Sequence, residues 1–232
     1  MSKKVAILQS NYIPWKGYFD IIASVDEFIF YDEMQYTKND WRNRNKIKTQ
    51  NGLNWLTIPC ETKGAIENLQ KICDTKIIDK RWAKKHWNSI SNAYAKAPYF
   101  KEYKQFFEKL YNECENEEYL CKINYKFISA INEILGIKTK LSFSQDYGLV
   151  EGKTERLVDL VQKAKGNYYL SGPAAKDYID ENLFIKANVK LKWVDYTGYP
   201  QYPQLFPPFE HGVSILDLIF NCGPDARKYM KA

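Results

Sequence analysis

Histidine and cysteine are scarce in this sequence, and their scarcity narrows the chemistry that the chain can carry. The 232 residues include two histidines and five cysteines. No two of these cysteines are spaced as a Cys-x-x-Cys pair: Cys60, Cys73, Cys114, Cys121 and Cys222. An odd number of unclustered cysteines argues against a disulfide framework and against a structural zinc site. We therefore expect reduced core thiols and no metal.

Long apolar runs and nucleotide-binding fingerprints are also missing. No stretch approaches the ~20 apolar residues that cross a bilayer, and the first residues lead directly into a strand-like segment without a secretory apolar region. We expect a cytoplasmic protein with no membrane span. The sequence has no P-loop, no Gly-x-Gly-x-x-Gly fingerprint and no Gly-x-Ser-x-Gly elbow. Standard ATP or NAD binding therefore has no motif to support it, and the sequence identifies no cofactor.

What the sequence does have is a globular composition with many aromatic residues and a mild basic excess. Hydrophobic residues make up 45% and aromatic residues 16%, and the formal net charge is +6. A length of 232 residues is enough for one sizeable core. The positive charge suits an anionic small molecule, and it is too dilute to indicate nucleic acid. The sequence leaves the oligomeric state open.

The order of apolar patterns predicts an α/β fold with a mostly parallel, Rossmann-like sheet. A buried-strand pattern at 5–10, a helical pattern at 17–25 and a strand-like run at 26–31 predict a β-α-β unit with parallel strands. Strand and helix patterns alternate again from residue 139 onward, including a short proline-led helix at 173–180.

The segment between these two parts predicts a hairpin and a helical insertion. Asn51-Gly52 separates two strand-like runs and is a strong hairpin signal, because a tight turn needs positive φ. Helical spacing recurs over about residues 79–136. No linker or repeat divides the chain, so we predict one domain over residues 1–232.

The first candidate ligand site is the polar and aromatic loop from Gln9 to Asp20. Ligands of open parallel sheets bind outside the carboxyl ends of the strands, and the N-terminus of the following helix attracts anions. The alternative is a turn whose proline and tryptophan only pack. The candidate binding residues are Gln9, Asn11, Tyr12, Trp15, Gly17 and Tyr18, with Gly17 permitting close backbone approach.

The second candidate is the segment from Gln35 to Lys46, which follows the second predicted strand. If the segment is extended, Arg42, Arg44 and Lys46 share one face, where they can hold a phosphate. Trp41, Asn43 and Asn45 then share the other face. The alternative is a charged, solvated edge strand. Gln35 and these six residues are binding candidates.

The third candidate is Ser171-Gly172, which ends a strand just before Pro173. Ser171 can cap the following helix or donate a hydrogen bond to a ligand there, and the sequence leaves both interpretations open.

The fourth candidate is the segment from His211 to Asn221. His211 lies in a proline-flanked loop and is the candidate general base. Asp217 lies among apolar residues, where a partly buried carboxylate can orient a neighbour or act as a base. Ser214 and Asp217 also have capping-box spacing, which is a structural device. Ser214 and Asn221 are binding candidates, whereas His86, on an apolar helical face, is interpreted as structural.

The predicted start of the chain is comparable with that of the HIGH nucleotidylyltransferases, in which strand, loop, helix and strand bind a nucleotide triphosphate. The comparable stretch here, 14–18, keeps the glycine and lacks both histidines. The analogy bears on the fold, and it puts histidine-assisted nucleotidyl transfer in doubt.

Taken together, the segments resemble the WbqC-like protein family. The resemblance covers nearly the whole chain, with Ser10 standing where the family usually has proline. It is carried by Gln9-Ser-Asn-Tyr-Ile-Pro-Trp-Lys-Gly-Tyr-Phe, Gln35-Tyr, Trp41-Arg-Asn-Arg-Asn-Lys-Ile, Trp55-Leu-Thr-Ile-Pro, Tyr169-Leu-Ser-Gly-Pro and Ser214-Ile-Leu-Asp-Leu-Ile-Phe-Asn.

The resemblance implies cytoplasmic assembly of surface polysaccharides or other glycans. Our leading hypothesis is a transferase acting on a nucleotide-linked or amino sugar, by acyl or aminoacyl (glycine) transfer to a sugar amine. The arginine-rich segment would hold the phosphate of this small-molecule substrate, Tyr12 and Trp15 would stack on a sugar or base, and His211 or Asp217 would deprotonate the amine. The alternative is a non-catalytic sugar-nucleotide-binding or scaffold module of a glycan-assembly pathway.

Overall fold

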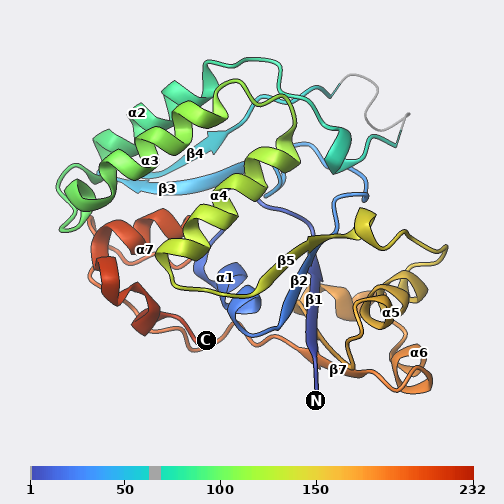
Figure 1. Ribbon diagram of the computed structural model, residues 1–232. Helices are drawn as coiled ribbons and strands as arrows, with labels where there is room; N and C mark the ends of the chain where they lie inside the picture. The colour runs from blue at the N-terminus through green and yellow to red at the C-terminus, as the bar shows by residue number, and fades with distance from the viewer. Residues whose placement is uncertain (1, 63–68) are drawn as a thin grey trace.

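A five-stranded parallel sheet forms the centre of the computed structural model, which describes residues 2–62 and 69–232 (Figure 1). Every neighbouring pair of strands is parallel, so the predicted α/β class with a mostly parallel, Rossmann-like sheet is confirmed. In spatial order the strands are β5 (Lys140–Phe143), β2 (Glu27–Phe30), β1 (Lys4–Leu8), β6 (Tyr168–Ser171) and β7 (Lys190–Trp193).

The strand order reverses direction at β1. From β1 the chain adds β2 and then β5 on one side, and it later adds β6 and β7 on the other side. Such a reversal is the topological switch point of a doubly wound sheet. The loops leaving β1 and β6 diverge there and open a crevice outside the carboxyl ends of the strands.

Residues of the central strands alternate between two apolar cores on opposite faces of the sheet. Ala6, Phe28 and Phe30 belong to the larger core, whereas Val5 and Ile29 belong to the smaller one. Both faces are buried, as is usual for parallel strands. The larger core is covered by α1 (Lys16–Ala23) and α7 (Ile215–Cys222) among others, and the smaller core by α5 (Thr154–Lys163) and α6 (Glu181–Lys186).

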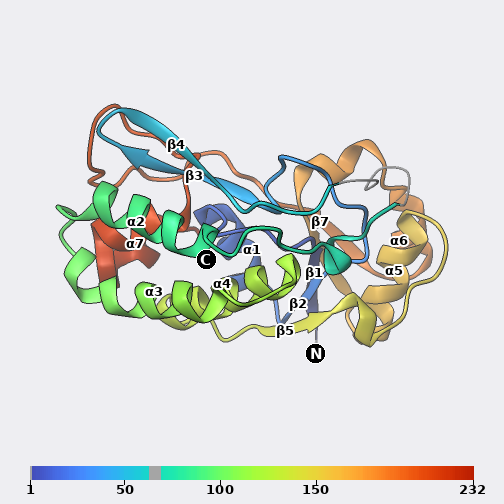
Figure 2. The same cartoon turned by 90° about the horizontal axis from the view of Figure 1, so that it is seen from above.

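The predicted helical insertion consists of α2 (Trp82–Tyr94), α3 (Phe100–Cys114) and α4 (Leu120–Ile134). Ile123, Phe127 and Ile131 of α4 are fully buried, as their helical spacing predicts. The buried residues of these helices join the larger core rather than forming one of their own. In Figures 1 and 2 these helices lie with α7 on the side of the molecule away from α5 and α6.

The predicted hairpin is present as β3 (Arg44–Thr49) paired with β4 (Gly52–Thr57). Gly52 has φ +101°, which explains why glycine follows the asparagine in this turn.

Among the described residues, five short elements differ from the sequence interpretation. The helix predicted at 173–180 is a 3₁₀ helix over Pro173–Asp177, labelled η3. The elements that were not predicted are α6 and the 3₁₀ segments η1 (Ile72–Asp74), η2 (Ser144–Asp146) and η4 (Gly223–Tyr229). One or two turns are too short to show a helical period. All five cysteines are unpaired thiols. Within the described ranges, no helix combines the length and the apolarity needed to cross a membrane.

Candidate functional site

A cavity of about 740 Å³ lies at the switch point of the sheet. Leu8 and Gln9, at the end of β1, line it on one side of the reversal, and Ser171 and Gly172, at the end of β6, line it on the other. Its volume lies within the ~300–1,000 Å³ of ligand pockets. The loops after β1 and β6, predicted separately from the sequence, therefore meet at one site.

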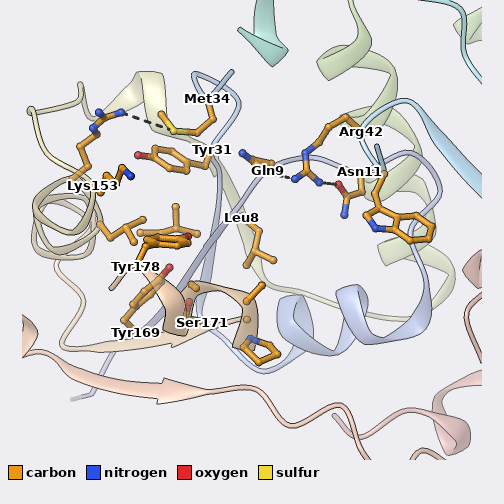
Figure 3. A pocket seen from close by; sticks show the side chains of 18 of the residues that line it. Leu8, Gln9, Asn11, Tyr31, Met34, Arg42, Lys153, Tyr169, Ser171 and Tyr178 are labelled. Carbon is orange, nitrogen blue, oxygen red and sulfur yellow. Dashed lines mark hydrogen bonds between the residues drawn. The ribbon is translucent and has the colours of Figure 1, made fainter. Parts of the chain in front are cut away.

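Arg42 forms one wall of this cavity in a fixed orientation. Its guanidinium group donates hydrogen bonds to the side-chain oxygens of Gln9 and Asn11 (Figure 3). An ion pair of 3.7 Å joins its Nη2 to Asp40 Oδ2. Arginine has five N–H donors, so some remain for a ligand. The bidentate geometry of these donors matches phosphate and carboxylate oxygens.

Two further cations, Lys153 and Arg156, line the cavity from the start of α5. Lys153, Tyr31 and Tyr178 lie across the cavity from Arg42 in Figure 3. Burial raises the pKa of the Tyr31 hydroxyl, so that it stays protonated and able to donate a hydrogen bond. The sequence does not point to Lys153 and Arg156 as site residues, because the helix at 154–163 shows only an amphipathic packing pattern. The crossover from β5 to β6 is what brings them to the site.

A second cavity, of about 310 Å³, adjoins the first and shares Asn11 and Trp41 with it. Trp15 and His211 line this smaller cavity. Burial and the positive charge of Lys16 lower the pKa of His211, while Glu210 opposes them. The imidazole is therefore neutral near pH 7, as a proton acceptor must be.

Asp217 was a candidate general base, and the structure gives it a different environment. It is fully buried and lines neither cavity. Its carboxylate accepts hydrogen bonds from Tyr94 Oη (2.9 Å), Tyr202 Oη (2.7 Å) and Gln204 Nε2 (2.8 Å). The predicted role as a base therefore has no geometric support.

Asp217 does position the loop that carries His211. Gln204, held by Asp217, accepts a hydrogen bond from the backbone N–H of Glu210 at 2.9 Å. The Glu210 carboxylate in turn accepts one from the N–H of Gly212 at 2.7 Å. The carboxylate thus acts on His211 through the conformation of the loop.

The other two candidates in this segment are internal. Ser214 is buried and caps α7, because its Oγ accepts from the Leu216 N–H at 3.3 Å. Of the two hydrogen bonds of a capping box, only this one is present, because the Asp217 carboxylate accepts from Tyr94, Tyr202 and Gln204 instead. Asn221 is buried and donates to the carbonyl of Asp217 at 2.8 Å.

Tyr12 was expected to stack on a ligand, and this expectation is wrong. Its side chain is fully buried, and its hydroxyl lies 2.9 Å from His86 Nδ1 and 2.7 Å from Tyr111 Oη. His86 Nε2 lies 3.2 Å from the Thr57 carbonyl oxygen, so that Nε2 carries the proton and Nδ1 accepts from the tyrosine. His86 is held inside a buried network, which agrees with its structural interpretation.

Tyr18 and Gly17 also differ from the expected roles. Tyr18 is buried and donates to the Gln9 carbonyl oxygen at 3.0 Å, so it supports the loop from beneath. A Cβ on Gly17 would overlap the indole of Trp15. The close approach that Gly17 permits is therefore filled by Trp15 rather than by a ligand.

The expectation that Arg42, Arg44 and Lys46 share one face is wrong. β3 begins at Arg44, and residues 41–43 form a turn, so the alternation does not extend back to Arg42. The Arg44 guanidinium lies 4.2 Å from the Trp55 ring centroid and Lys46 Nζ lies 5.4 Å from it. Only Arg42 reaches the large cavity.

The remaining candidates of this segment divide between structural and surface positions. Asn43 and Asn45 are buried; Asn43 donates to the Ile58 carbonyl oxygen at 2.9 Å. Trp41, expected on their side, instead lies on the side of Lys46, whose Nζ is 5.9 Å from its ring centroid. Gln35 is exposed and lines neither cavity. Within residues 2–62 and 69–232, no cluster of three or more histidine, cysteine or acidic side chains is arranged to hold a metal ion.

Fold and site together define a Rossmann-like α/β protein with a cation-lined crevice at the switch point of its sheet. The chain belongs to the WbqC-like protein family, whose model matches residues 9–229. It is 50% identical over 229 residues to the uncharacterized protein Rv1507c of Mycobacterium tuberculosis (strain ATCC 25618 / H37Rv), covering 99% of this chain and 98% of that protein. No solved structure matches the chain. Membership of this family is consistent with a role in polysaccharide biosynthesis.

Proposed function

We propose that this protein is a cytoplasmic transferase of surface-polysaccharide or other glycan biosynthesis, and that its substrate is a nucleotide-linked or otherwise phosphate-bearing amino sugar. The observation that carries the proposal is that three cations of the described residues, Arg42, Lys153 and Arg156, line one cavity of about 740 Å³. Guanidinium and ammonium groups bind phosphate oxygens strongly in such partly desolvated sites. Family membership supports the glycan setting.

We propose acyl or aminoacyl transfer, with glycine as one such group, to the sugar amine. The amine nitrogen attacks the carbonyl carbon of an activated acyl donor and forms a C–N bond. The bond from that carbon to the leaving group breaks, and the leaving group departs with the electron pair. The amine loses one proton, and His211, neutral near pH 7 because burial lowers its pKa, accepts that proton.

A sugar-nucleotide-binding module without catalysis is the second candidate. The hydrogen bonds that occupy the buried Asp217 carboxylate favour this candidate, because they leave His211 as the one remaining base among the predicted catalytic residues. Substitution of His211 separates the two functions. In an enzyme, His211→Ala lowers the rate of transfer at saturating substrate by about 10²-fold or more, whereas in a binding module neither the wild type nor the variant catalyses transfer.

Calorimetric titration with UDP- and dTDP-linked amino sugars tests the proposal. We expect binding to the wild-type chain, and an affinity about 10- to 100-fold lower in Arg42→Ala and Arg156→Ala, because each loses a charge-assisted hydrogen bond. Lys101→Ala removes an exposed cation of α3 outside the cavity and is the matched control. Absence of heat with every nucleotide sugar, in a folded protein, would contradict the proposal.

A further inference from the structure

The smaller cavity has a different chemical character from the proposed phosphate site beside it. Its volume of about 310 Å³ is at the lower end of the range for ligand pockets. Rings of Pro14, Trp15, Trp41 and His211 line much of it. Of the described residues that line it, none is a lysine or an arginine. Such a cavity suits a single ring rather than a charged group.

The first wall of this cavity is fixed by hydrogen bonds within the loop after β1. Asn45 Nδ2 donates to the carbonyl oxygens of Tyr12 (3.2 Å) and Ile13 (2.9 Å). These bonds help to hold Ile13 at φ +35°, a conformation that β-branched residues rarely adopt. Strained residues of this kind persist where the surroundings hold them, often at ligand sites. They place Pro14 and Trp15 in the wall.

The other walls are joined to the first by backbone hydrogen bonds. The N–H of Tyr12 donates to the Trp41 carbonyl oxygen at 3.0 Å, which brings the Trp41 turn against the loop. The N–H of Ile215 donates to the Pro14 carbonyl oxygen at 2.9 Å, and that of Ser214 to the Lys46 carbonyl oxygen at 2.8 Å. These two bonds, from Ser214 and Ile215, therefore fix the chain a few residues after His211. These backbone bonds hold the walls of the cavity against one another.

Among the described residues that line the smaller cavity, few side-chain amide and imidazole groups remain available to a ligand. The side-chain amide of Asn45 already has protein partners. Its Nδ2 donates to the carbonyl oxygens of Tyr12 and Ile13, and its Oδ1 accepts from the Lys46 N–H at 2.8 Å. Asn11 Oδ1 is held by Arg42, which leaves the amide N–H₂ of Asn11 as a donor. His211 supplies the second polar group. Aromatic walls with one amide and one imidazole match a pyranose ring, which has apolar C–H faces and polar substituents at its edge.

We infer that the smaller cavity binds the sugar ring of the nucleotide-linked substrate, with the ring against Trp41 and its edge toward Asn11 and His211. This inference rests on the proposed function, since the diphosphate then lies among Arg42, Lys153 and Arg156 in the larger cavity. Asn11 and Trp41 line both cavities and mark the passage between them. The arrangement puts the sugar amine beside the imidazole that accepts its proton.

The test compares each nucleoside diphosphate with its sugar conjugate, by calorimetry on the full chain. UDP is paired with UDP-glucosamine and dTDP with a dTDP-linked amino sugar. We expect the wild type to bind at least one conjugate about tenfold more tightly than the free diphosphate, from ring contacts and hydrogen bonds. In His211→Ala and Trp41→Ala this ratio falls toward one, while His211→Ala leaves the affinity for the free diphosphate within about twofold, because His211 lines only the smaller cavity.

Trp41 is 43% exposed, so its removal leaves the core intact. Trp193→Ala is the matched control, because Trp193 lies on β7 and lines neither cavity, and we expect it to keep the wild-type ratio. Equal affinities of wild type for diphosphate and conjugate, or equal losses for both in His211→Ala, would overturn the inference and leave the proposed function standing. If no nucleotide binds at all, the proposed function fails, and the inference with it.

Discussion

At the scale of single residues, surroundings decide what a carboxylate can do. Asp217 lies in an apolar stretch, which made it a candidate base. Three neutral donors from α2 and the loop before α7 converge on its two oxygens. Burial raises the pKa of Asp217 and these donors lower it. A carboxylate in this position stabilises the packing of α7 against its neighbours.

Asp217→Ala should therefore be strongly destabilising. It leaves two buried hydroxyl groups and one amide without their acceptor, and each unsatisfied group costs ~1–3 kcal/mol. We expect the free energy of unfolding to fall by roughly 3 kcal/mol or more, as measured by urea denaturation followed by tryptophan fluorescence.

Asp225→Ala is the matched control for this change. Asp225 lies nearby in the chain on η4, where it forms an exposed 2.8 Å ion pair with Lys228. Surface pairs of this kind contribute little, so the control should unfold like wild type. Equal urea midpoints for all three proteins would show that the network around Asp217 does not stabilise the fold.

At the scale of elements, two helices are followed by glycines of positive φ that differ in the space around them. Gly136, with φ +65°, follows α4, and Gly223, with φ +52°, follows α7. A Cβ on Gly136 would meet no atom within 4 Å. A Cβ on Gly223 would overlap the ring of Tyr99, whose N–H donates to the carbonyl oxygen of Phe220 in α7 at 3.0 Å.

Alanine should cost more at Gly223 than at Gly136, because two effects add there. Gly136→Ala loses mainly the freedom of glycine at positive φ, which costs ~1–2 kcal/mol. Gly223→Ala forces a side chain onto a backbone with φ +52° and ψ −126°, outside the left-handed helical region, and also displaces the Tyr99 ring, which overpacking data put at ~1–3 kcal/mol. We expect Gly223→Ala to lower the free energy of unfolding by at least ~1–3 kcal/mol more than Gly136→Ala in the same denaturation measurement. Equal losses would contradict both the added backbone strain and the steric overlap at Gly223.

Elements with local signals were predictable, and contacts made by distant segments were not. The first β-α-β unit, the Asn51-Gly52 hairpin and α4 follow from periodicity and turn chemistry within a few residues. The burial of Tyr12 depends on α2 and α3, whose residues are 74 and 99 positions away. The turn at 41–43, which breaks the expected alternation of Arg42 with Arg44, is held in part by its bond to the loop after β1.

The candidate site was predictable to a similar extent. Gln9, Asn11, Arg42, Ser171 and Gly172 were expected from strand ends, and all line the large cavity. Strand-end logic works here because parallel strands present their carboxyl ends at one edge of the sheet. Lys153 and Arg156 come from a helix start, and only the crossover connection shows that they face the same crevice.

At the scale of the whole molecule, two buried ionisable groups from different parts of the fold oppose each other. Asp32 follows β2, and its Oδ1 accepts from the Ser10 N–H at 2.7 Å, while its Oδ2 is buried with no partner among the described residues. Burial raises the pKa of Asp32 from 3.8 to about 6. Burial in α2 lowers the pKa of His86 from 6.5 to about 4.

The signs of their contributions to stability follow from which state binds more protons. Between pH 4 and 6 the folded chain holds the Asp32 proton more tightly than the unfolded chain, so this contribution falls as the pH rises. Between pH 6.5 and 4 the unfolded chain protonates His86 more readily, so this contribution falls as the pH falls. Over the shared window the two changes offset each other.

Single substitutions should therefore reveal opposite pH dependences. Relative to wild type, Asp32→Asn should gain roughly 3 kcal/mol in free energy of unfolding as the pH rises from 4 to 6.5, because it lacks the buried charge. His86→Gln should gain a similar amount, relative to wild type, as the pH falls over the same range, because it lacks the group that only the unfolded chain protonates. The measurement is urea denaturation at intervals across this range, in which each difference curve removes the contributions common to both proteins.

The double variant is the control: whatever its overall stability, its pH profile should run parallel to that of wild type. Two single variants whose curves also run parallel to wild type would show that neither group is perturbed by burial.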